Sequence, residues 1–188
     1  MASAYGGICF IDMYEFPHAS VSRIEIPDTL KWELESRLLL IYTGTAHSSS
    51  DVHRKVIREL EDAGPQCPKL KPLRQAAERS RDALYAGDLK ALGKAMIANT
   101  EAQGDLNPSL IGKAHAEIIA IGRKHGAIGW KVNGAGGNGG SVTLLTGPDH
   151  SVQRAMVREI EAANPKYRNI PIRLADRGLR VWESELRG

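Results

Sequence analysis

The sequence predicts an α+β fold in which helices pack on one face of a mainly antiparallel sheet. Short apolar or alternating runs of strand length occur before residue 45 and again after residue 126. The stretch between them carries apolar residues at helical spacing, separated by glycines, prolines and capping residues. At 188 residues, the chain is long enough to bury a substantial core, and its 5% aromatic content makes that core mainly aliphatic.

The first third of the chain is predicted to be rich in β-structure. Residues 8–11 form a short apolar run, and residues 21–26 alternate apolar and polar side chains as a half-buried strand does. Pro27 and Asp28 interrupt this pattern. Residues 38–42 form a continuous apolar run that ends at Thr43-Gly44, which predicts a buried strand.

The middle of the chain is predicted to hold four helices. Each has apolar residues at helical spacing, and capping or breaking residues mark its ends. Gly64-Pro65 ends the first helix, and Asp88 caps the third. The four helices are predicted to follow the caps at 48–51, to span 73–85, to start after 88, and to span 114–124.

The last third is predicted to return to strands. Residues 131–133 and 141–145 flank a glycine cluster, and Asp149 or Ser151 caps a helix that runs to about Ala163. Residues 170–174 and 178–182 are predicted to close the sheet as a strand pair. Pro171 favours an edge or a bulge at that point, because it has no N–H to donate.

Composition excludes several classes of protein. The net charge is +3 and the basic residues alternate with acidic ones, so no stripe for nucleic acid is expected. No apolar run approaches the roughly 20 residues of a membrane helix. Cys9 and Cys67 have no metal-binding spacing, which favours a reducing, cytoplasmic setting. The N-terminal residues carry Asp12 and Glu15 and do not fit the pattern of a signal peptide.

The glycine cluster is the most informative segment. Five glycines occur within residues 134–140, and ordering them costs conformational entropy. Glycines permit positive φ and close approach of a phosphate or another backbone, so the cluster fits an anion-binding nest. A glycine-rich hairpin or bulge without a ligand fits equally well. The Walker A pattern is absent, and the dinucleotide fingerprint fails because residues 141–145 predict a strand where that motif opens a helix.

The run from Gly126 to Gly140 resembles the third conserved motif of the GHMP kinases, which include galactokinase, homoserine kinase, mevalonate kinase and phosphomevalonate kinase. Four further segments are similar to the sugar-phosphate kinases related to D-glycero-D-manno-heptose 7-phosphate kinase. The resemblance covers essentially the whole chain. These four segments are residues 2–7, 38–44, 47–49 and 99–103.

The resemblance implies a set of site residues. The glycine loop of these kinases lies beside the loop that binds the nucleotide phosphates, so Gly134, Ala135, Gly136 and Gly137 are expected to line the pocket. The resemblance places Thr43, Gly44 and His47 on the sugar or phosphate side. Ser48, at a predicted helix N-terminus, and Lys131, which precedes the loop, are further candidates for contact with that ligand. The residue types alone are also compatible with simpler roles: Lys131 fits a solvated strand, His47 a polar surface and Ser48 ordinary helix capping.

The resemblance also implies ATP and Mg²⁺ as cofactors and a sugar or sugar phosphate as substrate. In these kinases the ATP phosphate loop and a catalytic Asp belong to an N-terminal part that these residues do not match. We therefore expect residues 1–45 to complete a kinase core and residues 46–188 to form the C-terminal domain. We assign no catalytic residue, and we expect the chain to be incomplete alone and to associate with an N-terminal kinase half or with itself.

Two functions remain open from the sequence. The first is the C-terminal part of an ATP-dependent sugar or sugar-phosphate kinase, which transfers a phosphoryl group to a sugar hydroxyl. The second is a non-catalytic phosphosugar-binding or interaction module derived from such a kinase. The sequence does not identify the sugar or the hydroxyl, and it leaves open whether the chain alone is an enzyme.

Overall fold

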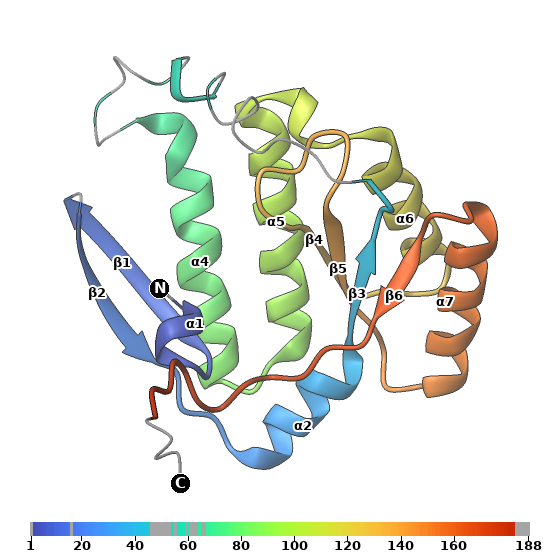
Figure 1. The fold of residues 1–188 in the computed structure, drawn as a ribbon, viewed down its shortest axis with the longest axis horizontal. Helices are drawn as coiled ribbons and strands as arrows, with labels where there is room; N and C mark the ends of the chain where they lie inside the picture. Colours follow the sequence, from blue (N-terminus) through green and yellow to red (C-terminus); the bar gives the residue numbers. More distant parts are fainter. Residues whose placement is uncertain are drawn as a thin grey trace, which may run out of the picture.

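A four-stranded antiparallel sheet forms the centre of the fold, with strand order β4-β5-β3-β6 (Figure 1). The computed structural model describes residues 2–15, 17–45, 54, 56–58, 60, 64 and 67–182. The predicted α+β class with a mainly antiparallel sheet is confirmed. The strands are β3 (Leu38–Tyr42), β4 (Gly129–Val132), β5 (Ser141–Leu145) and β6 (Arg168–Ile170).

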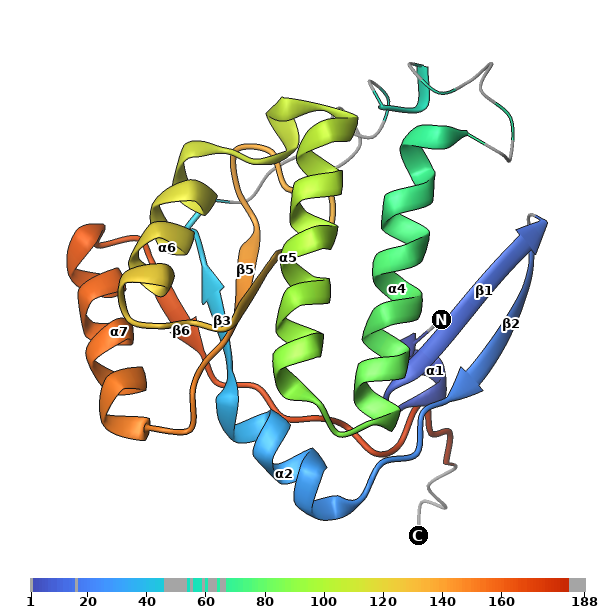
Figure 2. The same cartoon turned by 180° about the vertical axis from the view of Figure 1, so that it is seen from behind.

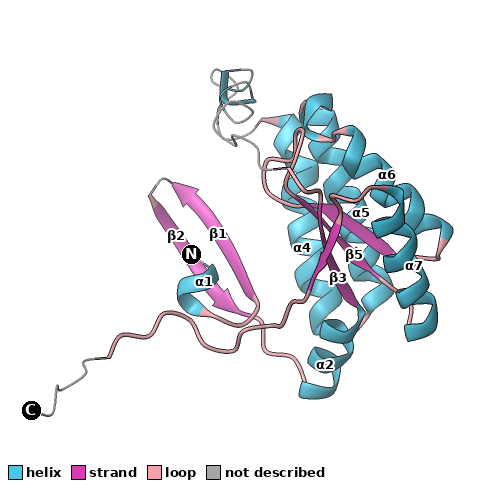
Figure 3. Cartoon of the chain, turned by 45° about the vertical axis from the view of Figure 1, so that its right-hand side comes forward, coloured by secondary structure: helices cyan, strands magenta, loops and turns pink. Residues whose placement is uncertain are grey.

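Four long helices gather on one side of this sheet, as Figure 3 shows. The antiparallel pair of α4 and α5 stands beside the β4 edge, and α6 and α7 cover the other end of the layer (Figure 2). Asp88 caps α5, as the sequence predicts, and Asp149, one of the two predicted candidates, caps α7. The helices are α4 (Lys71–Tyr85), α5 (Leu89–Leu106), α6 (Lys113–Lys124) and α7 (His150–Ala163).

The main core lies between the sheet and the two helices α6 and α7. Alternate strand residues point to one face, and these are aliphatic and fully or nearly buried. On the opposite face, the alternate residues of β3 and both Ser141 and Thr143 of β5 are half-buried, whereas Leu145 is fully buried. The core cluster comprises Leu39, Ile41, Ile118, Val132, Val142, Leu144, Met156, Ile160 and Tyr167.

Helix α5 protects the free edge of β4. Thr100 Oγ1 donates a hydrogen bond to Trp130 O at 3.2 Å and accepts one from Val132 N at 3.3 Å. Gly93 allows this approach, because a Cβ there would lie 2.2 Å from Ile128 O. The edge strand is therefore covered rather than left open to pair with another chain.

The N-terminal residues form a separate two-stranded sheet. Strand β1 (Cys9–Glu15) pairs antiparallel with β2 (His18–Arg23), preceded by the short helix α1 (Ala2–Tyr5). This hairpin reaches α4 through Arg81, whose guanidinium lies 4.7 Å from the centre of the Phe10 ring. Figure 1 shows the hairpin on the far side of α4 from the four-stranded sheet.

The predicted closing strand pair, residues 170–174 and 178–182, is wrong. Strand β6 covers only residues 168–170, and residues 171–182 contain no strand. This segment bonds to the N-terminal residues instead: Gly7 N donates to Ala175 O at 2.6 Å, and Leu179 N donates to Ala4 O at 3.0 Å. Helix α2 (Asp28–Arg37) was not predicted either, because its apolar residues do not gather on one helical face.

The two predicted parts of the chain, residues 1–45 and 46–188, both contribute strands to the four-stranded sheet. Strand β3, from residues 1–45, lies between β5 and β6, which come from residues 46–188. The division at residue 45 stays a prediction. The helix predicted after the caps at 48–51 falls largely outside the described residues. Within the described part of the chain, no helix has both the length and the apolar character needed to cross a membrane.

Candidate functional site

The glycine loop, residues 133–140, connects β4 to β5. Four of its glycines have positive φ: 63° at Gly134, 63° at Gly136, 82° at Gly137 and 93° at Gly140. A side chain at these positions would force the backbone into a left-handed region that only glycine enters at little cost. Positive φ therefore accounts for four of the five glycines.

Close backbone contacts account for the loop's packing. A Cβ on Gly136 would lie 1.9 Å from Leu110 O, and a Cβ on Gly139 would lie 2.3 Å from Thr45 O. The fit extends to the neighbouring segment, where a Cβ on Gly112 would lie 2.2 Å from Gly137 O. The glycines thus let this loop lie directly against two other stretches of main chain.

Hydrogen bonds fix the loop on both sides. Gly137 N donates to Leu110 O at 2.8 Å, and Gly140 N donates to Thr45 O at 3.0 Å. Two N–H groups of the cluster are therefore bonded to protein carbonyls. A nest that offers all its N–H groups to a phosphate does not match this arrangement.

His115 joins the loop to the start of α6. Its ring is fully buried, its Nδ1 accepts a hydrogen bond from Gly112 N at 3.1 Å, and its Nε2 lies 3.0 Å from Gly139 O. Because Nδ1 is the acceptor, the hydrogen bond to Gly139 O requires the proton on Nε2. His115 was not among the predicted site residues, and no local sequence pattern marks it.

Gln103 holds the other end of the loop. Its side chain is 7% exposed, and Nε2 donates to Gly134 O at 3.0 Å. The neighbouring Glu101 is exposed to solvent. The resemblance included the segment 99–103, which contains both residues. The structure shows that Gln103 contacts the loop and that Glu101 does not line it.

A pocket of about 230 Å³ lies where the loop meets α5 and β4. Lys131, Gly134 and Ala135 were all predicted from the sequence, and the structure brings them together here with the amides of Asn99 and Gln103. None of the residues that line it carries a carboxylate. The apolar part of the wall is Val56, Leu73, Leu106 and Leu110.

Lys131 gives this pocket its positive charge. Its Nζ donates to Val132 O at 2.9 Å, and no ion pair of the described residues includes it. Burial lowers the pKa of its ammonium group below the ordinary value. An anion beside Nζ would offset that desolvation, so the pocket favours a ligand with a negative group.

The other predicted residues have different positions. Thr43 is buried, and both its N and its Oγ1 donate to Gly140 O, at 2.9 Å and 3.0 Å. Gly44 lies against Lys166, since a Cβ on it would be 2.3 Å from Lys166 Cβ. Both residues support the loop from outside the pocket lining. Gly136 and Gly137 are buried within the loop, and His47 and Ser48 lie outside the described residues.

A polar cluster on the open face of the sheet was not expected from the sequence. Asn133 Nδ2 donates to Ser141 Oγ at 3.0 Å and to Thr143 Oγ1 at 2.9 Å. Lys131 shares this face, because it pairs with Thr143 across β4 and β5. The cluster therefore continues the polar surface from the pocket along the sheet.

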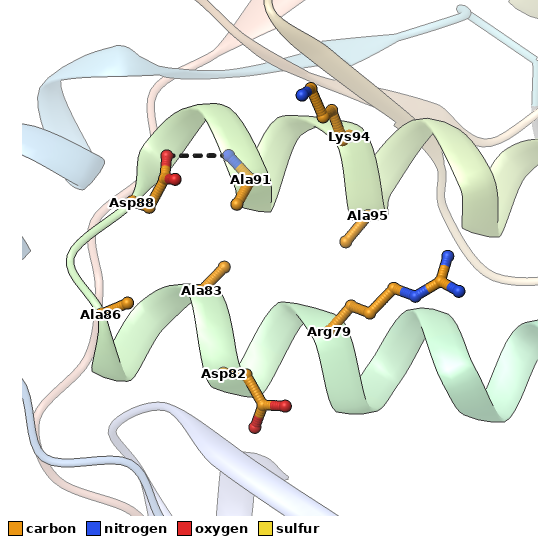
Figure 4. A pocket seen from close by; sticks show the side chains of 8 residues that line it. All are labelled: Arg79, Asp82, Ala83, Ala86, Asp88, Ala91, Lys94 and Ala95. Carbon is orange, nitrogen blue, oxygen red and sulfur yellow. Dashed lines mark hydrogen bonds between the residues drawn. The ribbon is translucent and has the colours of Figure 1, made fainter.

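A second pocket, of about 450 Å³, lies between α4 and α5. Figure 4 shows alanines from both helices facing one another across it. Asp82 and Asp88 on its rim balance Arg79 and Lys94, and Asp88 already accepts hydrogen bonds from Lys90 N and Ala91 N at 2.9 Å. Nothing in this lining selects a charged ligand, so we do not assign it a function.

The described residues contain no cluster of metal-ligating side chains. Within them no group of three or more His, Cys, Asp or Glu side chains could hold a metal ion. The pocket beside the glycine loop also lacks the carboxylate oxygens that Mg²⁺ prefers.

The chain was compared with family models, with curated proteins and with solved structures. No family model matches the chain. D-glycero-α-D-manno-heptose 7-phosphate kinase of Campylobacter jejuni is 22% identical over 138 residues, which are 73% of this chain and 40% of that protein.

Solved structures match over more of the chain. L. major mevalonate kinase, in complex with R-mevalonate, has a TM-score of 0.68 and 23% identity over 89% of this chain and 49% of that one. A D-glycero-D-manno-heptose 1-phosphate kinase from Bacteriodes thetaiotaomicron has a TM-score of 0.60 and 19% identity over 97% of this chain and 48% of that one.

These matches confirm the resemblance at the level of the fold: the chain has the fold of a GHMP kinase C-terminal region. The chain spans about half the length of the solved relatives and 40% of the curated one.

Proposed function

We propose that this chain forms the substrate side of an ATP-dependent sugar or sugar-phosphate kinase. The observation that carries the proposal is the convergence of Lys131, Gly134 and Ala135 on one pocket that also holds two side-chain amides. The relative named as a heptose 7-phosphate kinase supports a phosphorylated sugar as the ligand class.

The pocket's side chains suit the two parts of such a ligand. The Lys131 ammonium would meet a phosphate, because a charge-assisted hydrogen bond gains most where the cation is desolvated. The Asn99 amide has no hydrogen-bond partner among the described residues, so it can donate to and accept from sugar hydroxyls. Gln103 holds Gly134 through Nε2 and keeps its Oε1 for a hydroxyl.

The glycine loop would position the ligand rather than cradle the ATP phosphates. Its bonds to Leu110 O, Thr45 O and His115 fix the pocket wall in one conformation. A rigid wall reduces the entropy lost when the reacting hydroxyl is oriented. Thr43 contributes to the same rigidity through its two bonds to Gly140 O.

Phosphoryl transfer also requires ATP, Mg²⁺ and a group that orients the attacking hydroxyl. We propose that polypeptide outside the described residues provides these three parts, because no carboxylate lines the pocket. An N-terminal kinase half, or self-association of the chain, would complete the site. A cytoplasmic setting is part of the same proposal.

Calorimetric titration of the purified chain tests the proposal. A heptose 7-phosphate is expected to bind with 1:1 stoichiometry, and the matched unphosphorylated heptose about tenfold more weakly, since loss of one charged contact costs about 1.4 kcal/mol. Mg·ATP is titrated separately, because the proposal expects no strong ATP site in this chain alone.

Two variants locate the binding. Lys131→Met is expected to weaken the heptose 7-phosphate about tenfold, whereas Lys113→Met removes the same charge from the exposed start of α6 and leaves binding unchanged. Equal binding of both heptoses, or equal loss in both variants, would overturn the assignment. Sugar-phosphate binding without catalysis after addition of ATP and an N-terminal kinase half would favour the non-catalytic module.

A further inference from the structure

A third pocket, of about 280 Å³, lies between α7 and the strands β3 and β6. It is on the opposite face of the sheet from Lys131. Lys131 pairs with Thr143 and Thr143 pairs with Leu40, so these three share one face, and Leu39 points to the other. The lining residues are Leu39, Gln153, Arg154, Val157, Arg158 and Asn169.

The side chains that line this pocket carry a net positive charge, and the Glu161 carboxylate, which accepts from Asn169 N at 3.1 Å, lies next to the lining. Arg154 and Arg158 are four residues apart on α7, so they lie one above the other and repel each other. Asp149 reaches Arg154 by a long-range attraction only, and no ion pair of the described residues includes Arg158. No carboxylate lines the pocket.

Two other charged pockets contain their own counterions. The pocket between α4 and α5 holds two acids and two bases, and the pocket beside Trp32 pairs Glu35 with Arg173. In those linings an added anion would compete with a resident carboxylate. At the α7 pocket it would instead relieve the repulsion between the two arginines.

Neutral groups complete the site. The side-chain amide of Asn169 has no hydrogen-bond partner among the described residues, although its backbone N donates to Glu161 Oε1 at 3.1 Å. Asn169 pairs with Ile41, which places it on the core face with Leu39. Gln153 is held in place, because its Nε2 donates to Ser36 O at 2.9 Å. Leu39 and the half-buried Val157 supply apolar surface next to these groups.

We propose that the α7 pocket binds a small organic anion with an apolar body. Its carboxylate or phosphate group would lie between Arg154 and Arg158, where two guanidinium groups offer paired N–H donors. The Asn169 amide would donate a further hydrogen bond, and the apolar body would contact Leu39 and Val157. The site is independent of the proposed kinase pocket.

Titration of the ¹⁵N-labelled chain with three probes tests this site by NMR. Benzoate supplies a carboxylate on an apolar ring, benzamide has the same shape without the charge, and inorganic phosphate has the charge without the ring. Benzoate is expected to shift the side-chain amide signals of Gln153 and Asn169 with saturation. Benzamide and phosphate are each expected to bind at least tenfold more weakly.

Variants assign the effect to the two arginines. The double variant R154Q/R158Q changes exposed side chains, so it is expected to fold normally and to lose at least tenfold in benzoate affinity. Lys90→Gln removes a positive charge from the exposed side of α5 and is expected to leave the affinity unchanged. Equal binding of benzamide, stronger binding of phosphate, no saturation, or unchanged binding in the double variant would each overturn the proposal.

Discussion

The glycine loop and the β1–β2 hairpin both connect or contain antiparallel strands, but they are held in different ways. The loop packs main chain against main chain, and Ala135, Gly136 and Gly137 are buried. The hairpin leaves large side chains in solvent, with Met13 53% and Tyr14 70% exposed. In the loop, close main-chain packing makes stability sensitive to substitution of a glycine. In the hairpin, substitution of one exposed side chain is expected to change stability little.

The largest difference in the free energy of unfolding is expected between alanine substitutions at Gly136 and at Gly134. Gly136 and Gly134 both have φ of 63°, but only Gly136 has a carbonyl within 4 Å of the added Cβ, Leu110 O at 1.9 Å. Gly136→Ala is expected to lower the free energy of unfolding by about 3 kcal/mol, combining backbone strain and overpacking.

Gly134→Ala is the matched control, since it carries the same backbone strain without the overlap. It is expected to lose about 1 kcal/mol in urea denaturation. Equal losses in the two variants would mean that Leu110 does not constrain the loop.

The next largest effect is expected at His115. His115→Phe keeps a ring but leaves Gly112 N–H and Gly139 C=O without their partner, so the free energy of unfolding is expected to fall by about 2 kcal/mol. His18→Phe makes the same change on the exposed hairpin and is expected to stay within about 0.5 kcal/mol. Thermal unfolding of both variants measures the difference, and similar melting temperatures would contradict it.

A smaller effect is expected at Gln103. Gln103→Leu removes the hydrogen bond to Gly134 O, and because Gly134 is exposed, water can replace the lost donor. The expected loss is about 1 kcal/mol. Urea denaturation at constant pH measures it, and a loss as large as that of Gly136→Ala would show that the two ends of the loop are equally constrained.

The smallest effect is expected at Tyr14. Tyr14→Ser on the hairpin is expected to change the free energy of unfolding by less than about 0.5 kcal/mol, because the side chain is mostly exposed. A loss above about 1.5 kcal/mol would show that Tyr14 packs against a partner, in this chain or in a second copy. Light scattering on the same sample would separate those two cases.

The periodic part of the fold could be predicted from the sequence. Residues 38–42 and 141–145 form strands with the predicted bounds, and Asp88 and Asp149 cap their helices. These features depend on local apolar patterns and caps. Helix α2 and the path of residues 171–182 depend instead on contacts with distant segments, so local patterns do not reveal them.

Part of the candidate site follows from the sequence. The glycine motif and its resemblance pointed to Gly134, Ala135 and the adjacent Lys131, which line one pocket, and their role in binding stays a prediction. His115 and Asn133 were not predictable, since the bond that ties His115 to the loop spans 24 residues and the bonds of Asn133 across the sheet span 8 and 10. The pattern also left the cause of the glycines open, and the structure assigns it to positive φ at four positions and to close backbone contacts at Gly136 and Gly139.

A backbone NMR titration with a heptose 7-phosphate tests most directly whether the pocket of Lys131, Gly134 and Ala135 is the ligand site. We expect saturable shifts of the amide signals of these residues and of Asn99, with the amides of the β1–β2 hairpin unchanged. Shifts confined to the hairpin, or no shifts at millimolar ligand, would contradict the assignment of this pocket.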